Sequence, residues 1–111
     1  MAYYINRVTL RGKISMKVKY SKTVDGNEFC SFNIEMNNNQ QRTYDKTARD
    51  TMFYLHIMVF KKEVVEYLKR NNAKQNDVVT IEGRLNCKRV EMKGIEFYQT
   101  NIIAHDIQIT K

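Results

Sequence analysis

Near the N-terminus of the chain, apolar and polar residues alternate in steps of two. Every second side chain between residues 8 and 20 is apolar except at Gly12, the apolar ones being Val8, Leu10, Ile14, Met16, Val18 and Tyr20. Successive side chains of a β-strand point to opposite faces, so this spacing predicts one long strand over residues 8–20. One face of that strand is expected to lie in a core.

The other face of the same segment is basic. It carries Arg7, Arg11, Lys13, Lys17 and Lys19, and there is no acidic residue between Arg7 and Lys22. The whole chain has 19 Lys and Arg against 12 Asp and Glu, a formal net charge of +7. Such an excess favours a polyanionic partner, and a stripe of this kind can follow a nucleic-acid backbone. A solvated strand face without a partner is the alternative reading.

Four further segments have the spacing of strands, namely residues 29–36, 52–60, 77–90 and 95–109. Asp25-Gly26 and Lys93-Gly94 are turn-forming pairs, and they predict hairpins between the first and second strands and between the fourth and fifth. In the third strand, the odd positions suit the core, and these are Phe53, Leu55, Ile57 and Val59. A break in the last strand is expected between residues 104 and 106.

Only residues 62–71 have a helical period, with Val64, Val65 and Leu68 on one side. The resulting order is three strands, a helix and two strands. This order predicts a mainly β oligonucleotide-binding (OB) fold, a five-stranded barrel with one short helix between strands 3 and 4. Gly12 and Gly83 support a barrel, because glycine lets a tightly coiled strand bend where a side chain would collide. Residues 1–111 are expected to form a single domain.

No motif for catalysis, metal binding or export is evident. Cys30 and Cys87 form no C-x-x-C pair, and His56 and His105 lack the carboxylate or nucleophile of a catalytic set. We therefore expect no enzyme activity, no metal and no cofactor. The chain has no secretory signal and no apolar run of about 20 residues. These features favour a cytoplasmic protein with reduced thiols and no membrane partner, with Cys30 buried on a core face.

Three blocks of the sequence resemble the bacterial and phage-type single-stranded DNA-binding proteins of the OB-fold family. The first is Asn6-Arg7-Val8-Thr9-Leu10-Arg11-Gly12-Lys13-Ile14. The second covers residues 52–68 and includes Val59-Phe60-Lys61-Lys62 and Glu66-Tyr67-Leu68. The third, and the most specific, is Val79-Thr80-Ile81-Glu82-Gly83-Arg84-Leu85. The blocks occur in the family's order, over most of residues 6–103.

The resemblance implies a domain that binds single strands by stacking bases on aromatic rings and neutralising phosphates. Tyr54 and Phe60 stand at two stacking positions of the family. A third family aromatic falls near Val90, where Tyr98 on the facing strand is the expected substitute. A fourth lies in the loop after the second strand, where Tyr44 is the candidate. That loop, residues 37–50, is almost wholly polar and is expected to be mobile.

Several other residues are candidates for the same interface. His56 is expected to share a strand face with Tyr54, because side chains two apart point the same way. Lys61 and Lys62 adjoin Phe60, where they either neutralise phosphates or only begin the helix on its solvated side. Arg84 and Lys88 are the basic candidates on the fourth strand.

The resemblance also implies homo-oligomers, dimers or tetramers, and roles in DNA replication, recombination and repair with other replication proteins as possible partners. Cellular members carry a long tail with an acidic tip, whereas this sequence ends at Thr110-Lys111. We expect a domain without that tail, either because the tail was removed or because the protein belongs to a short class from phages or mobile elements. Two alternatives stay open: a primosomal-type structural or adaptor protein, and an RNA-binding OB module of cold-shock type.

Overall fold

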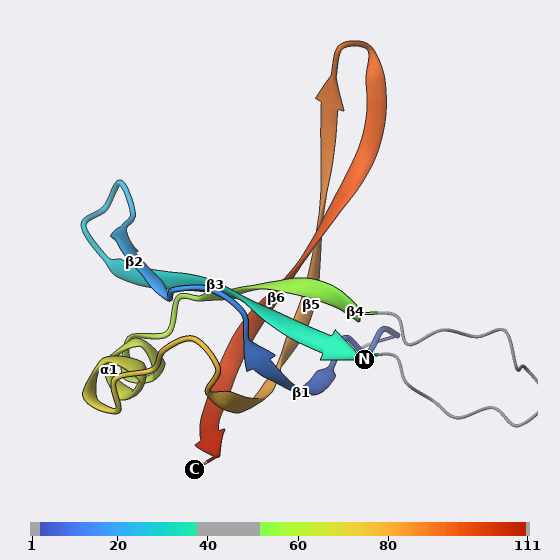
Figure 1. Cartoon of the computed structure of the whole chain (residues 1–111). Coiled ribbons are helices and arrows are strands. Elements are labelled where there is room, and N and C mark those ends of the chain that lie inside the picture. Colours follow the sequence, from blue (N-terminus) through green and yellow to red (C-terminus); the bar gives the residue numbers. More distant parts are fainter. Residues whose placement is uncertain (1–2, 38–51, 111) are drawn as a thin grey trace, which may run out of the picture.

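A computed structural model describes residues 3–37 and 52–110 of the chain (Figure 1). In chain order, its elements are β1 (Val8–Ile14), β2 (Lys19–Lys22), β3 (Glu28–Asn37), β4 (Met52–Val59), α1 (Lys62–Arg70), β5 (Val78–Met92) and β6 (Ile95–Thr110). The helix lies between β4 and β5, as the sequence predicts.

The strands pair into a closed ring. Their order is β1–β5–β6–β4–β3, and a short β1–β3 pairing at Lys13–Glu35 and Ile14–Ile34 closes it. All of these pairs are antiparallel except β4–β6, which is parallel. β2 pairs only with β3 among the described strands. The mainly β, five-strand plan is therefore confirmed, with the predicted first strand divided into β1 and β2.

The division between β1 and β2 corrects the expectation of one long strand. The amide of Ile14 still donates to the Asp77 carbonyl at 2.9 Å, but the amide of Ser15 donates to the Asn33 carbonyl at 2.9 Å. The chain thus changes partners at this point and bends. As a result Met16 is 59% exposed and Tyr20 37% exposed, although the alternation assigned both to the core.

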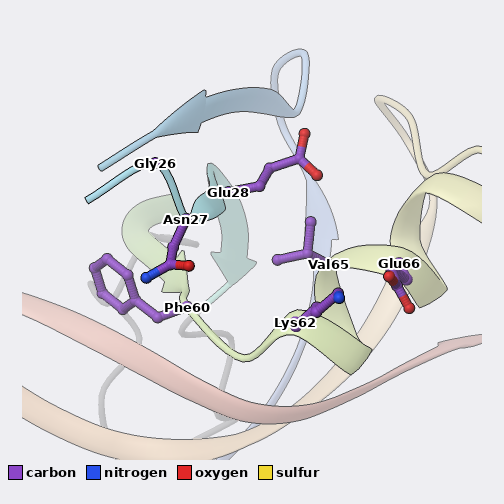
Figure 2. A pocket seen from close by; sticks show the side chains of 7 residues that line it. All are labelled: Gly26, Asn27, Glu28, Phe60, Lys62, Val65 and Glu66. Carbon is purple, nitrogen blue, oxygen red and sulfur yellow. The ribbon is translucent and has the colours of Figure 1, made fainter. Parts of the chain in front are cut away.

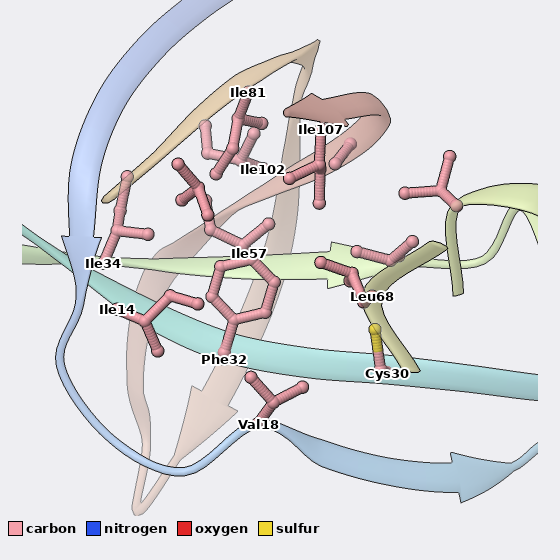
Figure 3. Close-up of a cluster of buried hydrophobic side chains, with 14 of the residues drawn as sticks. Ile14, Val18, Cys30, Phe32, Ile34, Ile57, Leu68, Ile81, Ile102 and Ile107 are labelled. Atoms are coloured by element: carbon pink, nitrogen blue, oxygen red, sulfur yellow. The ribbon is translucent and has the colours of Figure 1, made fainter. Parts of the chain in front are cut away.

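The core fills the space between the ring and α1 (Figure 3). Its largest fully buried members are Ile14, Ile34, Ile57, Leu68, Ile81, Ile102, Val59, Val65, Val79 and Cys30. Val64, Val65 and Leu68 are buried on one side of α1, as predicted. Phe53 is an exception, since it is 38% exposed. It pairs with Met36, whereas β4 pairs with β6 only from Ile57 onward, so Phe53 lies beyond the covered part of the ring.

Gly83 occupies a position where no side chain fits. A Cβ atom there would lie 2.1 Å from the backbone oxygen of Ile103. The β5–β6 register shifts between Glu82 and Gly83, which leaves His105 as the extra residue of a β-bulge. The need for glycine at residue 83 is confirmed, whereas the expected break near residues 104–106 is a bulge within the continuous strand β6.

Beyond this bulge, β5 and β6 continue as a two-stranded hairpin that stands away from the rest of the molecule (Figure 1). We call residues 86–101 the arm. Its turn has positive φ angles at Lys93 (54°) and Gly94 (78°), as a tight hairpin turn requires. At the base of the arm, the Asn6 side chain makes the two hydrogen bonds that a neighbouring strand would make with Leu85. Its amide donates to the Leu85 carbonyl and its oxygen accepts from the Leu85 amide, both at 2.8 Å.

Candidate nucleic-acid interface

The side of β3 and β4 that faces away from the core is the outer face of the ring. It carries Ser31, Asn33 and Glu35 from β3 and Tyr54, His56 and Met58 from β4. One row of register partners crosses this face on five strands, in the order Lys19, Ser31, Met58, Ile103 and Arg84. A cation therefore lies at each end of the row, with uncharged side chains between.

Tyr54 lies in a parallel row with Glu35 and Lys13, contributed by β4, β3 and β1. Its side chain is 59% exposed. It lines a hollow of about 330 Å³ together with Ser15, Met16, Asn33 and Glu35. Glu35 is directly opposite Tyr54 on the neighbouring strand, and Lys13 Nζ, one strand farther, lies 3.8 Å from Glu35 Oε2. An exposed aromatic with a cation on the same face is compatible with base stacking and phosphate contact.

His56 is fixed on the same face by a partner on the neighbouring strand. Its Nδ1 lies 3.0 Å from Oδ1 of Asn33, which is directly opposite in the β3–β4 ladder. Because an amide oxygen only accepts, Nδ1 is the protonated nitrogen in this pair. The expected placement of His56 beside Tyr54 is confirmed.

Phe60 follows β4 directly and is 44% exposed. Its ring is stacked on that of Phe29 from β3, with centroids 5.4 Å apart and planes at 29°. The backbone carbonyl of Lys61 accepts from the amides of Val64 and Val65 and so begins α1. The Lys61 and Lys62 side chains are both exposed; Lys62 lines the same cavity as Phe60 (Figure 2), whereas Lys61 lines a separate hollow with His105.

Beneath the helix, the thiol of Cys30 is buried as expected. Burial, reinforced by the nearby Glu28 carboxylate, raises the pKa of Cys30 to about 12. Burial is also the main cause that raises the pKa of Tyr20, with smaller contributions from Cys30 and Glu28. Both groups stay neutral at physiological pH, and Cys30 is a core residue.

The basic stripe expected along the first strand is divided by the bend after Ile14. Lys13 and Lys19 lie on the outer face. Arg11, two residues before Lys13 on the same side of β1, donates through Nε to Thr80 Oγ1 of β5 at 3.1 Å. Lys17 lines a separate hollow with Val18, Tyr20 and residues 72–75. Arg7 is exposed just before β1.

The outer face continues onto one side of the arm. Paired residues in an antiparallel ladder point the same way, so the row that ends at Arg84 is followed by Asn86–Asn101, Lys88–Gln99 and Val90–Phe97. Phe97, which is 42% exposed, is therefore the ring opposite Val90. Tyr98 pairs with Arg89 and points to the opposite side of the arm. The pairing of Val90 with Phe97 could have been predicted from the sequence, because the Lys93-Gly94 turn pairs Met92 with Ile95 and hence Val90 with Phe97.

Tyr44 falls outside the described residues. Within residues 3–37 and 52–110, no group of three or more His, Cys, Asp or Glu side chains is arranged to hold a metal ion. No helix in the same residues is both long enough and apolar enough to cross a membrane.

The family model for the Single-strand binding protein family matches residues 5–110. The chain belongs to this family. Among solved structures, it is similar to the Plasmodium falciparum SSB in complex with ssDNA, with a TM-score of 0.85 and 14% identity over 100% of this chain and 99% of that one. It is also similar to a deletion mutant of the single-stranded DNA binding protein from Thermus aquaticus, with a TM-score of 0.78 and 17% identity. That match covers 96% of this chain and 51% of the other. A search of curated proteins gave no match.

These comparisons confirm the OB fold and the family resemblance. In this single-strand binding protein, the residues that the sequence nominated separate into two groups. One group lies on the outer face, next to it beside Phe29, or on its continuation on the arm: Tyr54, His56, Phe60, Lys13, Lys19, Lys62, Arg84 and Lys88. Arg11 is on the same side of β1 as Lys13 but where β1 pairs with β5, and Arg7, Lys17, Lys61 and Tyr98 lie elsewhere on the surface. Phe29 and Phe97 are the aromatic residues that sequence analysis missed.

Proposed function

We propose that this chain binds single-stranded DNA without reading its sequence, and that the strand lies along the outer face and out onto the arm. The supporting observation is the continuity of that surface. It presents the rings of Tyr54, Phe60 and Phe97 on one side of a single ladder of strands. Base stacking on such rings contributes about 1–3 kcal/mol per base and tolerates any sequence.

The cations of this surface are spaced to contact the backbone of the same strand. Lys19 and Arg84 lie at opposite ends of one row, and Lys88 continues along the arm. Lys62 lines the same cavity as Phe60, and Lys61 precedes it in the chain with an exposed side chain. Aromatic rings between flanking cations suit a DNA strand whose bases point toward the protein and whose phosphates lie outside.

Single strands are favoured over duplex because a ring can stack only on a base that is unpaired. A titration with single-stranded DNA, duplex DNA and RNA of equal length at one salt concentration tests this. We expect the single-stranded DNA to bind tightest. Equal binding of the duplex would leave only attraction to basic charge, and tighter binding of RNA would favour an RNA-binding module.

The salt dependence identifies which cations contact phosphate. For single strands, the log–log slope of affinity against salt is about −0.7 per neutralised phosphate. Lys19→Ala, on the outer face, should flatten the slope by about 0.7, whereas Lys17→Ala, on the separate hollow, should leave it unchanged. The reverse result would place the DNA along the first strand and its bend.

We further propose that the protein works as a homo-oligomer in DNA replication, recombination or repair, in a phage, a mobile element or a bacterial chromosome. Family membership supports this setting. Light scattering of the full chain, with and without DNA, tests the assembly. If Phe60→Ala lowered the oligomer mass while leaving the affinity per subunit intact, Phe60 would belong to a subunit interface, as in an adaptor protein.

A further inference from the structure

His56 lies on β4, the central strand of the outer face, and its ring is held through one nitrogen. Nδ1 donates to Oδ1 of Asn33, directly opposite on β3, at 3.0 Å. The His56 side chain is exposed, and Tyr54 and Met58 flank it on the same side of β4. Nε2 is therefore the ring nitrogen that a strand lying across this face can contact.

The hydrogen-bonding character of Nε2 depends on the charge of the ring. With Nδ1 protonated, Nε2 of the neutral ring is an acceptor, whereas both nitrogens of the imidazolium donate. A phosphodiester oxygen only accepts, so it can bond to Nε2 only when the ring is charged. Histidine ordinarily changes its charge between about pH 5 and pH 8.

The neighbours of His56 leave such a cation for a ligand. Glu35, diagonal to His56 on β3, is the nearest carboxylate on the described part of the face, and its Oε2 already has a cation 3.8 Å away, Lys13 Nζ. On its other side, β6 presents the uncharged Asn101 and Ile103. The other titratable or charged groups of this face are Tyr54 on β4, Lys19 on β2 and Arg84 on β5. A phosphate would thus be a new anionic partner for His56.

We propose that His56 is a pH-dependent phosphate contact, so that the bound strand takes up a proton and the affinity for single-stranded DNA rises as the pH falls. The inference rests on the proposed function, because it needs a strand across the outer face. A phosphate stabilises the charged ring, so the complex binds this proton more tightly than the protein alone does. The added affinity is therefore lost as the pH rises through the range in which histidine titrates.

Titrations with an all-thymine strand from about pH 5.5 to about pH 8 test the inference, because neither thymine nor the phosphodiester titrates in this range. At the lower pH we expect affinity about two- to tenfold higher, the contribution of one hydrogen bond. The log–log salt slope should also be steeper by about 0.7, since one more phosphate is neutralised. Affinity and slope that do not change with pH would overturn the inference and leave the proposed function standing. No binding at any pH would overturn both.

The chain has two histidines, and they make a matched pair of variants. His56→Gln should abolish the pH dependence, because glutamine stays uncharged. His105→Gln should retain it, although Nε2 of His105 lies 3.5 Å from Nη1 of Arg84. A pH dependence that persists in His56→Gln, or that is lost in His105→Gln alone, would contradict the assignment.

A third variant tests the contact between His56 and Asn33. Asn33→Asp places a carboxylate of the same shape next to Nδ1, and an adjacent negative charge favours the charged ring. The affinity should fall at every pH, because a negative charge is added to the face, but the midpoint of the pH dependence should move to higher pH. A midpoint that stays in place or moves to lower pH would overturn the inference, because Asn33 would then not hold the ring.

Discussion

The body of the protein, formed by the ring and α1, and the arm share the strands β5 and β6 but differ in how they are stabilised. The body holds fifteen buried apolar side chains. In the arm, no residue between 86 and 101 is buried, and among the described strands those of the arm pair only with each other. β5 and β6 pass from the buried body to the exposed arm at the Gly83 bulge. The comparison shows that burial maintains the fold of the body, whereas the side chains of the arm stay exposed.

The largest expected difference between the two regions is in stability. Ile57→Ala should lower the free energy of unfolding by about 2–5 kcal/mol, because it removes a fully buried side chain from the body. Phe97→Ala in the arm should change it by less than about 0.5 kcal/mol. Urea unfolding measures both. Comparable losses would show that the arm packs against something in solution, such as a second copy.

A substitution at Gly83 should disturb the bulge that joins the body to the arm. Gly83→Ala should cost about 1–3 kcal/mol or more, because the new Cβ collides with the backbone of Ile103. Asn86→Ala, three residues farther along the same strand, is the control and should cost less than about 0.5 kcal/mol. If the two variants were equally stable, β5 and β6 would be able to separate at the bulge without penalty.

The buried thiol of the body predicts a dependence on pH. The pKa of Cys30 is about 12 in the fold against 9.0 unperturbed, so the unfolded chain releases this proton first as the pH rises. Keeping this thiol neutral therefore contributes to the free energy of unfolding. The contribution is fully present below pH 9 and is lost progressively up to pH 12, and the loss is about 1.4 kcal/mol at pH 10. Cys30→Ala should remove this slope, and Cys87→Ala, in the arm, should retain it. An unchanged slope in Cys30→Ala would assign the loss to Tyr20 or to other groups.

A smaller effect is expected at the base of the arm. Asn6→Ala removes two hydrogen bonds to Leu85 and should cost about 1 kcal/mol, with faster hydrogen exchange at the Leu85 amide. Asn6→Asp keeps an oxygen that accepts from the Leu85 amide, so this amide should exchange more slowly than in Asn6→Ala. If exchange at Leu85 were the same in all three proteins, Asn6 would not hold the arm.

The fold was largely predictable because local spacing and turn residues determine it. The alternation in β3 and β4, the helical period of α1 and the turn at Lys93-Gly94 each match the structure. The bend after Ile14 was not predictable, because it depends on backbone bonds to Asp77 and Asn33, which are remote in sequence. The same bend separates Lys17 from Lys13 and so divides the expected basic stripe.

The candidate site was predictable where it lies on one strand and less so where it depends on pairing. Tyr54 and His56 follow from alternation alone. Predicting that Phe29 belongs to the site required the β3–β4 register, which places Phe29 against Phe60 and which residue spacing does not give. Phe97 required only the hairpin register, which the short turn fixes.

The central claim is that DNA follows one side of the β5–β6 ladder from the ring onto the arm. Phe97 and Tyr98 are adjacent exposed rings on opposite sides of that arm, so single-strand affinities of Phe97→Ala and Tyr98→Ala test the claim directly. Phe97→Ala should cost about 1–3 kcal/mol of binding free energy, with the salt slope unchanged because no phosphate contact is lost. Tyr98→Ala should cost less than about 0.5 kcal/mol. A larger loss for Tyr98→Ala than for Phe97→Ala would contradict the claim.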